Sequence, residues 1–284
     1  MSSDLDELDT QRDYEQIVQL QILEGLGELR RPASGQFLSA VACGLHLAIG
    51  AFSLFVVLSL GAHLFNPFIM QVLQSTVYTF GFIFAILART ELFTEHTTLA
   101  VIPVLDGQAS LSELGQLWSL VLLGNLIGGT IFAVFGYHAG LALNIIDPHT
   151  FVTVATSYIH LSMTGIFLGA ILAGWLMGLL AWSLTSVGDT ISRIVVIFLV
   201  TFLIGFSHLP HCIAANAEVV AGMVAGANIS VLEWARFEAI ATLGNIVGGT
   251  VFVGLLNYSF AVRGADERDV YIESDSEEDS VTDE

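Results

Sequence analysis

The chain has 284 residues, of which 54% are hydrophobic and only 12% are charged. Soluble globular domains carry about 25% charged residues, so this composition argues against a cytosolic enzyme. Eight arginines and no lysine stand against 27 acidic residues, giving a net charge of −19, which excludes binding of nucleic acid or anionic lipid through a basic patch. Cys43 and Cys212 both lie in apolar runs and are expected to pack as small residues.

The acidic residues gather at the two ends of the chain. Eight lie in residues 1–30, ten lie in residues 261–284, and nine lie between them. Such polar ends cannot bury enough apolar surface to order themselves. We therefore predict an acidic cytoplasmic N-terminal segment over 1–32, a transmembrane domain over 33–262 and a disordered acidic cytoplasmic tail over 263–284. The surplus of acids without lysine suggests a halophile with a high-salt interior, and an acidic interaction tail is the simpler alternative.

Six apolar stretches fill the middle of the chain, and a weaker helical pattern precedes them. The stretches run over 36–60, 67–103, 115–138, 162–185, 191–226 and 237–262. A helix needs about 20 apolar residues to cross the hydrocarbon core, so four stretches fit one crossing each. The second and fifth are too long for one straight crossing and contain polar residues, which predicts broken or re-entrant helices. The pattern over 14–29 predicts a short amphipathic helix at the membrane surface.

The arginines predict the orientation in the membrane. With the N-terminus inside and six crossings, Arg236 falls outside and Arg89 falls within a stretch. The remaining six fall on the cytoplasmic side, namely Arg12, Arg30, Arg31, Arg193, Arg263 and Arg268. This bias follows the positive-inside rule. We expect a multi-pass protein of the cell (inner or plasma) membrane with both termini in the cytoplasm.

The sequence also contains an internal repeat. Residues 124–132 read GNLIGGTIF and residues 244–252 read GNIVGGTVF, at an offset of 120, and two SxxE capping boxes share that offset. At an offset of 130, seven residues of 35–53 match residues of 165–183. The repeat covers three crossings, so the second copy must be inverted. Inverted repeats are typical of channels and transporters with a pathway at the interface between the copies.

Polar residues interrupt the two long stretches. Residues 89–96 read RTELFTEH and residues 208–218 read HLPHCIAANAE. Adding 120 to Glu91 gives His211, so the two breaks are predicted to be equivalent. An ionisable side chain within a membrane is functional by default. His211 is therefore the strongest candidate, because histidine exchanges protons near neutral pH.

The other candidates have more modest roles. Thr94 offers a hydroxyl to a permeant or to the histidine, and Glu91 and Arg89 are expected to pair across the break. His208 and Cys212 lie near His211, but a zinc site would lack a fourth ligand, so we expect no metal and no cofactor. Apolar rings that close the path are expected from Phe93, Tyr78, Phe82 and Ile204. Asn125 and Asn245 are expected to form hydrogen bonds between helices that glycines bring close together.

These motifs together resemble the formate/nitrite transporter family, over about residues 33–262. The likeness rests on Glu91-Leu92-Phe93-Thr94, both GNxxGG segments, Gly165–Trp182 and the break that carries the histidine. Glu218 after His211 resembles a bacterial branch of the family. The resemblance implies an all-α integral membrane protein with six transmembrane helices, an inverted 3+3 repeat and an aquaporin-like fold. It also implies broken second and fifth helices and a homopentamer with one pore per protomer.

The resemblance also implies roles for residues. His211 would be the central pore histidine with Thr94 as its partner, Phe93 would belong to the inner constriction, and Phe82 and Tyr78 would lie near the outer one. The sequence departs from the family at three places. Members often carry a lysine where Tyr158 stands, with His160 nearby, and an asparagine where Gly174 stands. The family's GFEH reads Gly205-Phe206-Ser207-His208, so His208 competes with His211 for the central position.

The predicted function is a transmembrane channel or transporter for small monovalent anions or their conjugate acids, such as formate or nitrite. A bare anion in a dry constriction costs several kcal/mol. The hypothesis is that the anion gains a proton by way of His211 or its water, passes Phe93 as a neutral acid and ionises beyond it. The alternative is a membrane scaffold or sensor that recruits partners through the acidic tail. A membrane enzyme is disfavoured, because no triad, phosphate loop or metal constellation supports it.

Overall fold

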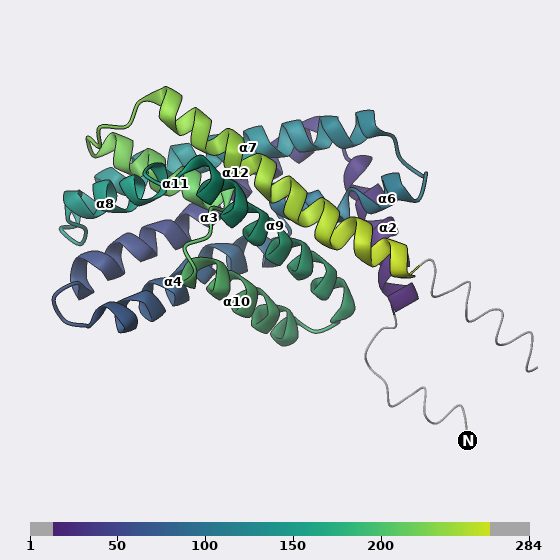
Figure 1. Cartoon of the computed structure of the whole chain (residues 1–284), viewed down its shortest axis with the longest axis horizontal. Helices are drawn as coiled ribbons and strands as arrows, with labels where there is room; N and C mark the ends of the chain where they lie inside the picture. Colours follow the sequence, from purple (N-terminus) through teal and green to yellow (C-terminus); the bar gives the residue numbers. More distant parts are fainter. Residues whose placement is uncertain (1–13, 262–284) are drawn as a thin grey trace, which may run out of the picture.

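The computed structural model describes residues 14–261, and this part of the chain is helical throughout, with no β-strand. The helices form an elongated bundle that is traversed lengthwise by the longest of them (Figure 1). Helix α2 (Tyr14–Leu29) lies at one end and helix α8 (Pro148–Ile159) lies at the other. We refer to these as the α2 end and the α8 end.

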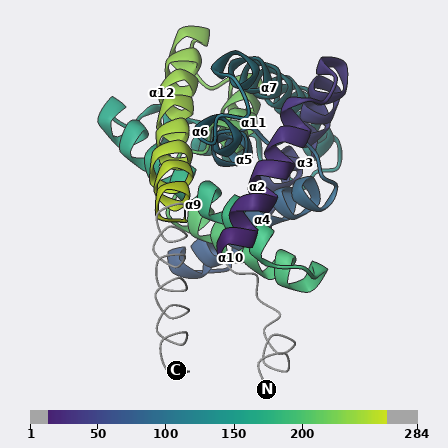
Figure 2. The same cartoon turned by 90° about the vertical axis from the view of Figure 1, so that its right-hand side faces the viewer.

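The remaining helices form two halves. In each half a long helix is followed by a second helix, one or two short helices and another long helix. The first half contains α3 (Ala33–Gly61), α4 (Pro67–Leu87), α5 (Phe93–Leu99), α6 (Ile102–Leu105) and α7 (Leu111–Ala142). The second contains α9 (Met163–Ser186), α10 (Thr190–Phe206), α11 (Cys212–Val224), α12 (Val231–Gly249) and the π-helical segment η1 (Thr250–Leu255). Seen from the α2 end, α5, α6 and α11 lie inside a ring of longer helices (Figure 2).

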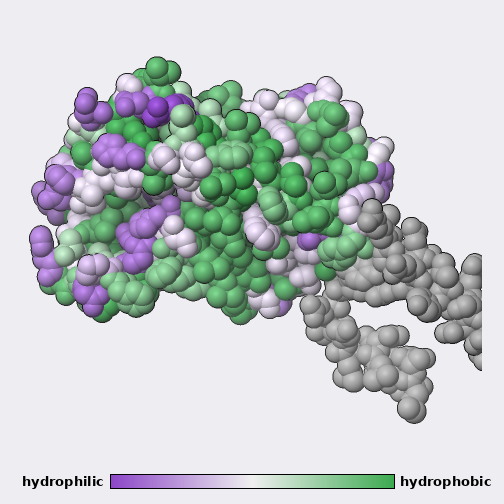
Figure 3. All heavy atoms as spheres, in the orientation of Figure 1, coloured by the Kyte–Doolittle hydropathy of each residue, from purple (hydrophilic) through white to green (hydrophobic). Residues whose placement is uncertain are grey.

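An apolar belt surrounds this bundle. Within residues 14–261, five helical stretches are long and apolar enough to cross a membrane: α3, α4, α7, α9 and Val231–Ala261. Helices α10 and α11 are apolar but shorter. Hydrophobic side chains cover the middle of the surface, whereas hydrophilic ones gather toward the α8 end (Figure 3). Helices satisfy their own backbone hydrogen bonds, which is what a structure surrounded by lipid requires.

Sequence signals at the helix starts operate as local caps. In α7 the Ser110 hydroxyl accepts from Glu113 N at 3.2 Å, while the Glu113 carboxylate accepts from Ser110 N at 2.8 Å. Ser230 and Glu233 repeat both contacts at the start of α12. The serine and glutamate satisfy amides that have no partner within the helix. Both capping boxes are therefore present, 120 residues apart.

Glycines set the distance between the two closest helix pairs. A Cβ added at Gly44 of α3 would lie 2.2 Å from the Asn125 oxygen of α7, and one at Gly128 would lie 2.1 Å from the Val41 oxygen. In the second half a Cβ at Gly174 of α9 would lie 2.2 Å from the Asn245 oxygen of α12. Only glycine fits such backbone contacts.

Helices α2 and α8 pack on opposite ends of the bundle. The pattern over 14–29 predicts α2 correctly as a helix, but its buried face docks on the bundle, where the Gln21 side chain donates to the Ala181 carbonyl at 3.1 Å. Helix α8 was not predicted. Its Ala155 packs on Gly222 of α11, just as Gly25 of α2 packs on Pro103 after α5. The contact that docks α2 in the first half therefore corresponds to the contact that docks α8 in the second half.

Docking of α2 is expected to weaken as the pH rises. Burial, reinforced by neighbouring Glu91, raises the pKa of the Glu28 carboxyl from 4.5 to about 7. A raised pKa means that the contribution to stability is complete below pH 4.5 and is lost as the pH passes through about 7. Glu28→Gln, which resembles the protonated acid, should remove this loss. We expect the melting temperature of the wild type to fall by about 2 °C or more between pH 5 and pH 8, and that of the variant to stay level.

Thermal unfolding of the detergent-solubilised protein measures the effect. Glu24→Gln, which changes an exposed carboxyl one turn earlier on α2, is the matched control and should keep the wild-type pH dependence. A Glu28→Gln variant that melts with the same pH dependence as the wild type would contradict the assignment.

Candidate transport pathway

Two breaks between helices meet near the middle of the bundle. Helix α4 ends at Leu87 and α5 begins at Phe93, whereas α10 ends at Phe206 and α11 begins at Cys212. After α4, Arg89 has a φ of 53°, and after α10, His208 has a φ of 49°. Both occupy the left-handed position that ends a helix with a Schellman motif. The two breaks therefore begin with the same backbone conformation.

The Schellman position of Arg89 allows a test of that conformation. A left-handed conformation costs a non-glycine residue about 1–2 kcal/mol. Arg89→Gly and Arg89→Ala remove the same side chain, so the difference between them isolates the backbone. We expect the glycine variant to melt about 2–4 °C above the alanine variant. Equal melting temperatures in thermal unfolding would show that the backbone at 89 relaxes without cost.

Asparagines hold both breaks in place. Phe93 N donates to Asn125 Oδ1 at 2.9 Å, and Asn125 Nδ2 donates to the Glu91 carbonyl at 2.8 Å. In the second half, Cys212 N donates to Asn245 Oδ1 at 3.0 Å. Each asparagine also donates to the neighbouring long helix, at Ala40 and Ala170 respectively, at 2.8 Å. These contacts satisfy the backbone groups that a broken helix exposes.

The hydrogen bonds correct the predicted register of the breaks. Phe93 and Cys212 make the same contact but differ by 119 rather than 120. His211 therefore corresponds to Leu92, since both precede the first residue of their half-helix, and the predicted equivalence of His211 with Glu91 is wrong by one residue. The second half has one more residue than the first between the amide that makes this contact and the asparagine that accepts it.

His211 and Thr94 face each other from the two half-helices. Both are fully buried, and His211 Nε2 lies 2.8 Å from Thr94 Oγ1. On the other side of the ring, Ala214 N donates to His211 Nδ1 at 3.3 Å. Because Nδ1 accepts, the ring hydrogen is assigned to Nε2, which donates to Thr94. The Thr94 hydroxyl hydrogen then remains for another acceptor.

Aromatic rings flank this pair. Phe82 lies 5.1 Å from the His211 ring and Tyr78 lies 5.3 Å from Phe82, centre to centre. On the α5 side, Phe93 packs edge-on against Trp118 at 6.2 Å. All four residues that were predicted to close the path are buried: Phe93, Tyr78, Phe82 and Ile204. The polar pair therefore lies between apolar side chains.

The ion pair predicted between Glu91 and Arg89 is wrong. Glu91 is 3% exposed, and its carboxylate contacts Arg31 and His96 instead. Arg31 also contacts Glu28 of α2 at 3.1 Å. No ion pair of Arg89 occurs among residues 14–261. Arg89 ends α4 in the left-handed conformation, so the closer cation in sequence is not the one that reaches the carboxylate.

A cavity of about 280 Å³ opens beside this cluster at the α2 end. Its walls come from α2, from the break after α4 and from α5. The ionisable residues among them are Glu24, Glu28, Arg89, Glu91, Glu95, His96 and Arg193. The cavity reaches α5, which carries Phe93 and Thr94. It is a polar vestibule on one side of the central pair.

His208 does not share the centre with His211. It is exposed, and its Nε2 lies 2.9 Å from Gln71 Oε1 of α4. Of the two competing histidines, His211 is thus the buried one that contacts Thr94. In the described chain no three His, Cys, Asp or Glu side chains are grouped closely enough to hold a metal ion.

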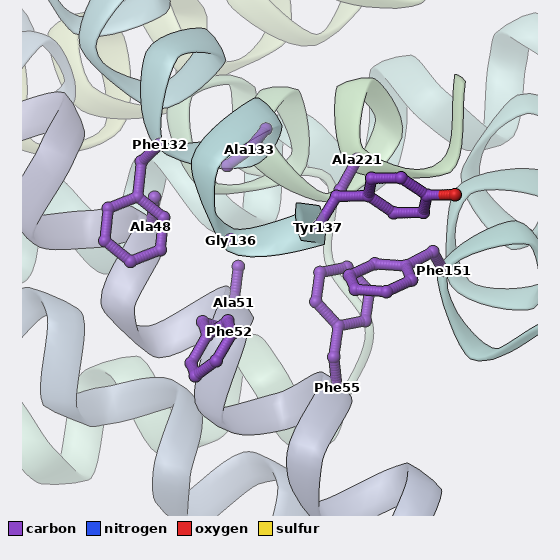
Figure 4. A pocket seen from close by; sticks show the side chains of 11 residues that line it. Ala48, Ala51, Phe52, Phe55, Phe132, Ala133, Gly136, Tyr137, Phe151 and Ala221 are labelled. Atoms are coloured by element: carbon purple, nitrogen blue, oxygen red, sulfur yellow. The ribbon is translucent and has the colours of Figure 1, made fainter. Parts of the chain in front are cut away.

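A small apolar pocket lies apart from these residues. Figure 4 shows Phe55, Tyr137 and Phe151 beside Gly136, between α3, α7 and α8. Its volume of about 10 Å³ is that of a single water molecule at most. Neither His211 nor Thr94 lines it, so this pocket is a packing gap rather than a site.

Sequence reasoning missed several residues that the structure brings to the path. His96 lies in the RTELFTEH segment but was assigned no role, and its partners Arg31 and Glu28 come from α2 and the turn after it. Tyr158 and Glu218 lie beside each other at the α8 end. Glu218 had been singled out by its place after His211, but its contact with Tyr158 was not predicted.

Two half-length helices that meet at a buried polar pair inside an apolar bundle define a multi-pass membrane protein of the channel and transporter type. The family model described as formate/nitrite transporter matches residues 15–259. The chain belongs to the formate/nitrite transporter family. The predictions of this family, of an all-α membrane protein and of a transporter rather than an enzyme are thereby confirmed.

Known relatives agree with this assignment. The inner membrane protein YfdC of Escherichia coli is 33% identical over 253 residues, covering 83% of this chain and 75% of YfdC. The nitrite transporter NirC of Salmonella typhimurium is 25% identical over 237 residues, covering 78% and 81%.

Solved structures share the fold. An FNT family ion channel superposes with a TM-score of 0.77 at 22% identity, over 86% of this chain and 98% of that one. A pentameric formate channel with formate bound superposes with a TM-score of 0.69 at 24% identity, over 81% and 98%.

Proposed function

We propose that the chain conducts small monovalent anions together with a proton, as a channel or transporter for formate, nitrite or a similar weak acid. The observation that carries this proposal is the buried His211–Thr94 pair between Phe82 and Phe93. Membership of the family and the formate and nitrite named for its relatives support the substrate class.

The path runs from the vestibule at the α2 end, past Phe93 to the central pair, and on past Phe82 and Tyr78. A monovalent anion that enters the apolar segment pays a desolvation penalty of several kcal/mol unless a proton neutralises it. The neutral acid still carries oxygen atoms that need a donor. The Thr94 hydroxyl, polarised by His211, supplies that donor midway along the path.

The topology that fits this path is an inverted repeat of six crossings. Helices α3, α4 with α5, and α7 form one triplet, and α9, α10 with α11, and α12 form the other, with the second crossing of each triplet broken. The α2 end is cytoplasmic, which agrees with the arginine bias. Asn125 and Asn245 support the breaks. A homopentamer, as described for one structural neighbour, covers part of the exposed apolar surface.

Flux measurements on proteoliposomes test the function. Formate, acetate, nitrite and hydrosulfide are supplied outside at pH 5.5 and pH 7.5, and uptake is compared with that of liposomes without protein. Uptake of at least one of these, faster at the lower pH, is expected. If none of them enters faster than into empty liposomes at either pH, transport of weak-acid anions is refuted.

A further inference from the structure

Glu218 is a buried carboxyl group that the proposed path does not yet use. It is 1% exposed, and neither carboxylate oxygen has a hydrogen-bond partner of good geometry within residues 14–261, although the Tyr158 hydroxyl lies close to the carboxyl. His211 is the N-cap of α11, and Glu218 lies seven positions later in the sequence, about two turns along the helix. Glu218 therefore lies about 10 Å nearer the α8 end than His211.

The neighbours of Glu218 connect it to the central pair. The Tyr158 hydroxyl of α8 lies beside its carboxyl, and Tyr78 of α4 is the other ionisable side chain that interacts with it. Tyr78 packs on Phe82 at 5.3 Å, and Phe82 packs on His211 at 5.1 Å. The order along the path is thus Glu218, Tyr78, Phe82 and His211.

No opposite charge compensates Glu218. Helix α11 packs against α3, α7, α8 and α12. The ionisable residues of these four helices are Cys43 and His46 of α3, Glu113, Tyr137 and His138 of α7, His149 and Tyr158 of α8, and Glu233, Arg236 and Glu238 of α12. Of these, Tyr158 alone interacts with the carboxyl. An unpaired carboxylate is unfavourable in such a site, so Glu218 is held as the neutral acid.

His211 is a poor source of the proton that the permeant needs. Its Nδ1 already accepts from Ala214 N, so the ring is neutral with its hydrogen on Nε2. Giving up that hydrogen would leave an imidazolate. The carboxylic acid nearest in sequence to His211 on the α8 side of the path is Glu218.

The geometry points to Glu218 as a proton-exchange site for a weak-acid permeant at the α8 end of the path. This inference rests on the proposed transport function. An anion that enters from the α8 end accepts the proton of the Glu218 carboxyl: the O–H bond of the glutamic acid breaks, and an O–H bond forms on the permeant. The neutral acid then passes Tyr78 and Phe82 toward His211. Water at the α8 end returns a proton to the Glu218 carboxylate, so one proton crosses with each anion.

Formate uptake against external pH tests this role. Proteoliposomes of the full chain, with the interior buffered at pH 7, take up radiolabelled formate at external pH 5, 6, 7 and 8. We expect Glu218→Gln to lower the uptake about tenfold at pH 7, but by less than about twofold at pH 5, where more formic acid is already present in solution. Glu218→Asp keeps a titratable carboxyl and should retain the wild-type pH profile at a reduced rate.

Controls separate proton exchange from structural damage. Glu238→Gln neutralises another buried carboxyl without hydrogen bonds, on α12 beside Cys212, and should leave the pH profile unchanged. A Glu218→Gln variant with the wild-type profile, or with equal loss at all four pH values, overturns the inference but leaves transport intact. A wild type that takes up none of formate, acetate, nitrite and hydrosulfide faster than empty liposomes refutes the transport function itself.

Discussion

Replacing His211 by phenylalanine is expected to lower formate uptake about a hundredfold, which is the usual effect of removing a preorganised donor from a buried polar site. The phenylalanine ring makes no hydrogen bond with Thr94 and completes an unbroken apolar segment with Phe82 and Phe93. His211→Asn is the informative comparison. Asparagine is a good N-cap for α11 and offers an amide donor, so we expect a loss of less than about tenfold.

The pH profile of the asparagine variant separates two roles of the histidine. If the neutral ring only donates a hydrogen bond, as the contact between Ala214 N and Nδ1 implies, the variant keeps the wild-type dependence of formate uptake on pH. A lost or shifted dependence would instead make His211 the proton source. Wild-type rates in the phenylalanine variant would remove the central pair from the path altogether.

Gly128→Ala is expected to destabilise the bundle by about 3 kcal/mol or more. The added Cβ would lie 2.1 Å from the Val41 oxygen of α3, and backbone cannot move aside as a flexible side chain can. Helices α3 and α7 would have to separate, which would pull Asn125 away from the break that it holds. Thermal unfolding in detergent, together with gel filtration, measures the loss.

The same helix provides the control. Gly115 of α7 is exposed, and a Cβ there would meet nothing within 4 Å. Gly115→Ala should therefore leave stability unchanged or raise it by up to about 1 kcal/mol, because alanine favours helix. If both alanine variants have the same melting temperature, the close approach of α3 and α7 does not contribute to stability.

The local contacts of the two GNxxGG segments are the part of the structure that sequence alone predicts well. Identical residues at a constant offset, such as the asparagines and glycines of both GNxxGG segments, must satisfy the same local geometry. The predicted offset failed by one residue at the breaks because the second half has one additional residue between α11 and α12. Loops absorb such insertions without disturbing packed helices.

Contacts that depend on how helices dock on the bundle could not be predicted from the sequence. Glu91 pairs with Arg31, which lies 60 residues away, instead of Arg89, which lies two residues away. The choice follows from where α2 and the left-handed turn at Arg89 place the two cations. Helix α8 was missed because its 12 residues are too few to cross a membrane, although Phe151, Ala155 and Tyr158 recur at helical spacing. Packing on α11 stabilises it.

The paired asparagines have a consequence for how such a molecule diversifies. Because each holds its break through backbone atoms, the side chains at the breaks are free to change without loss of the scaffold. One break carries Glu91 and His96, which lie in a charged network, whereas the other carries a neutral imidazole and a solitary acid two turns away. The proposed path thus has two chemically unlike entrances, and a solute that arrives from one side of the membrane is expected to meet a different first partner than one that arrives from the other.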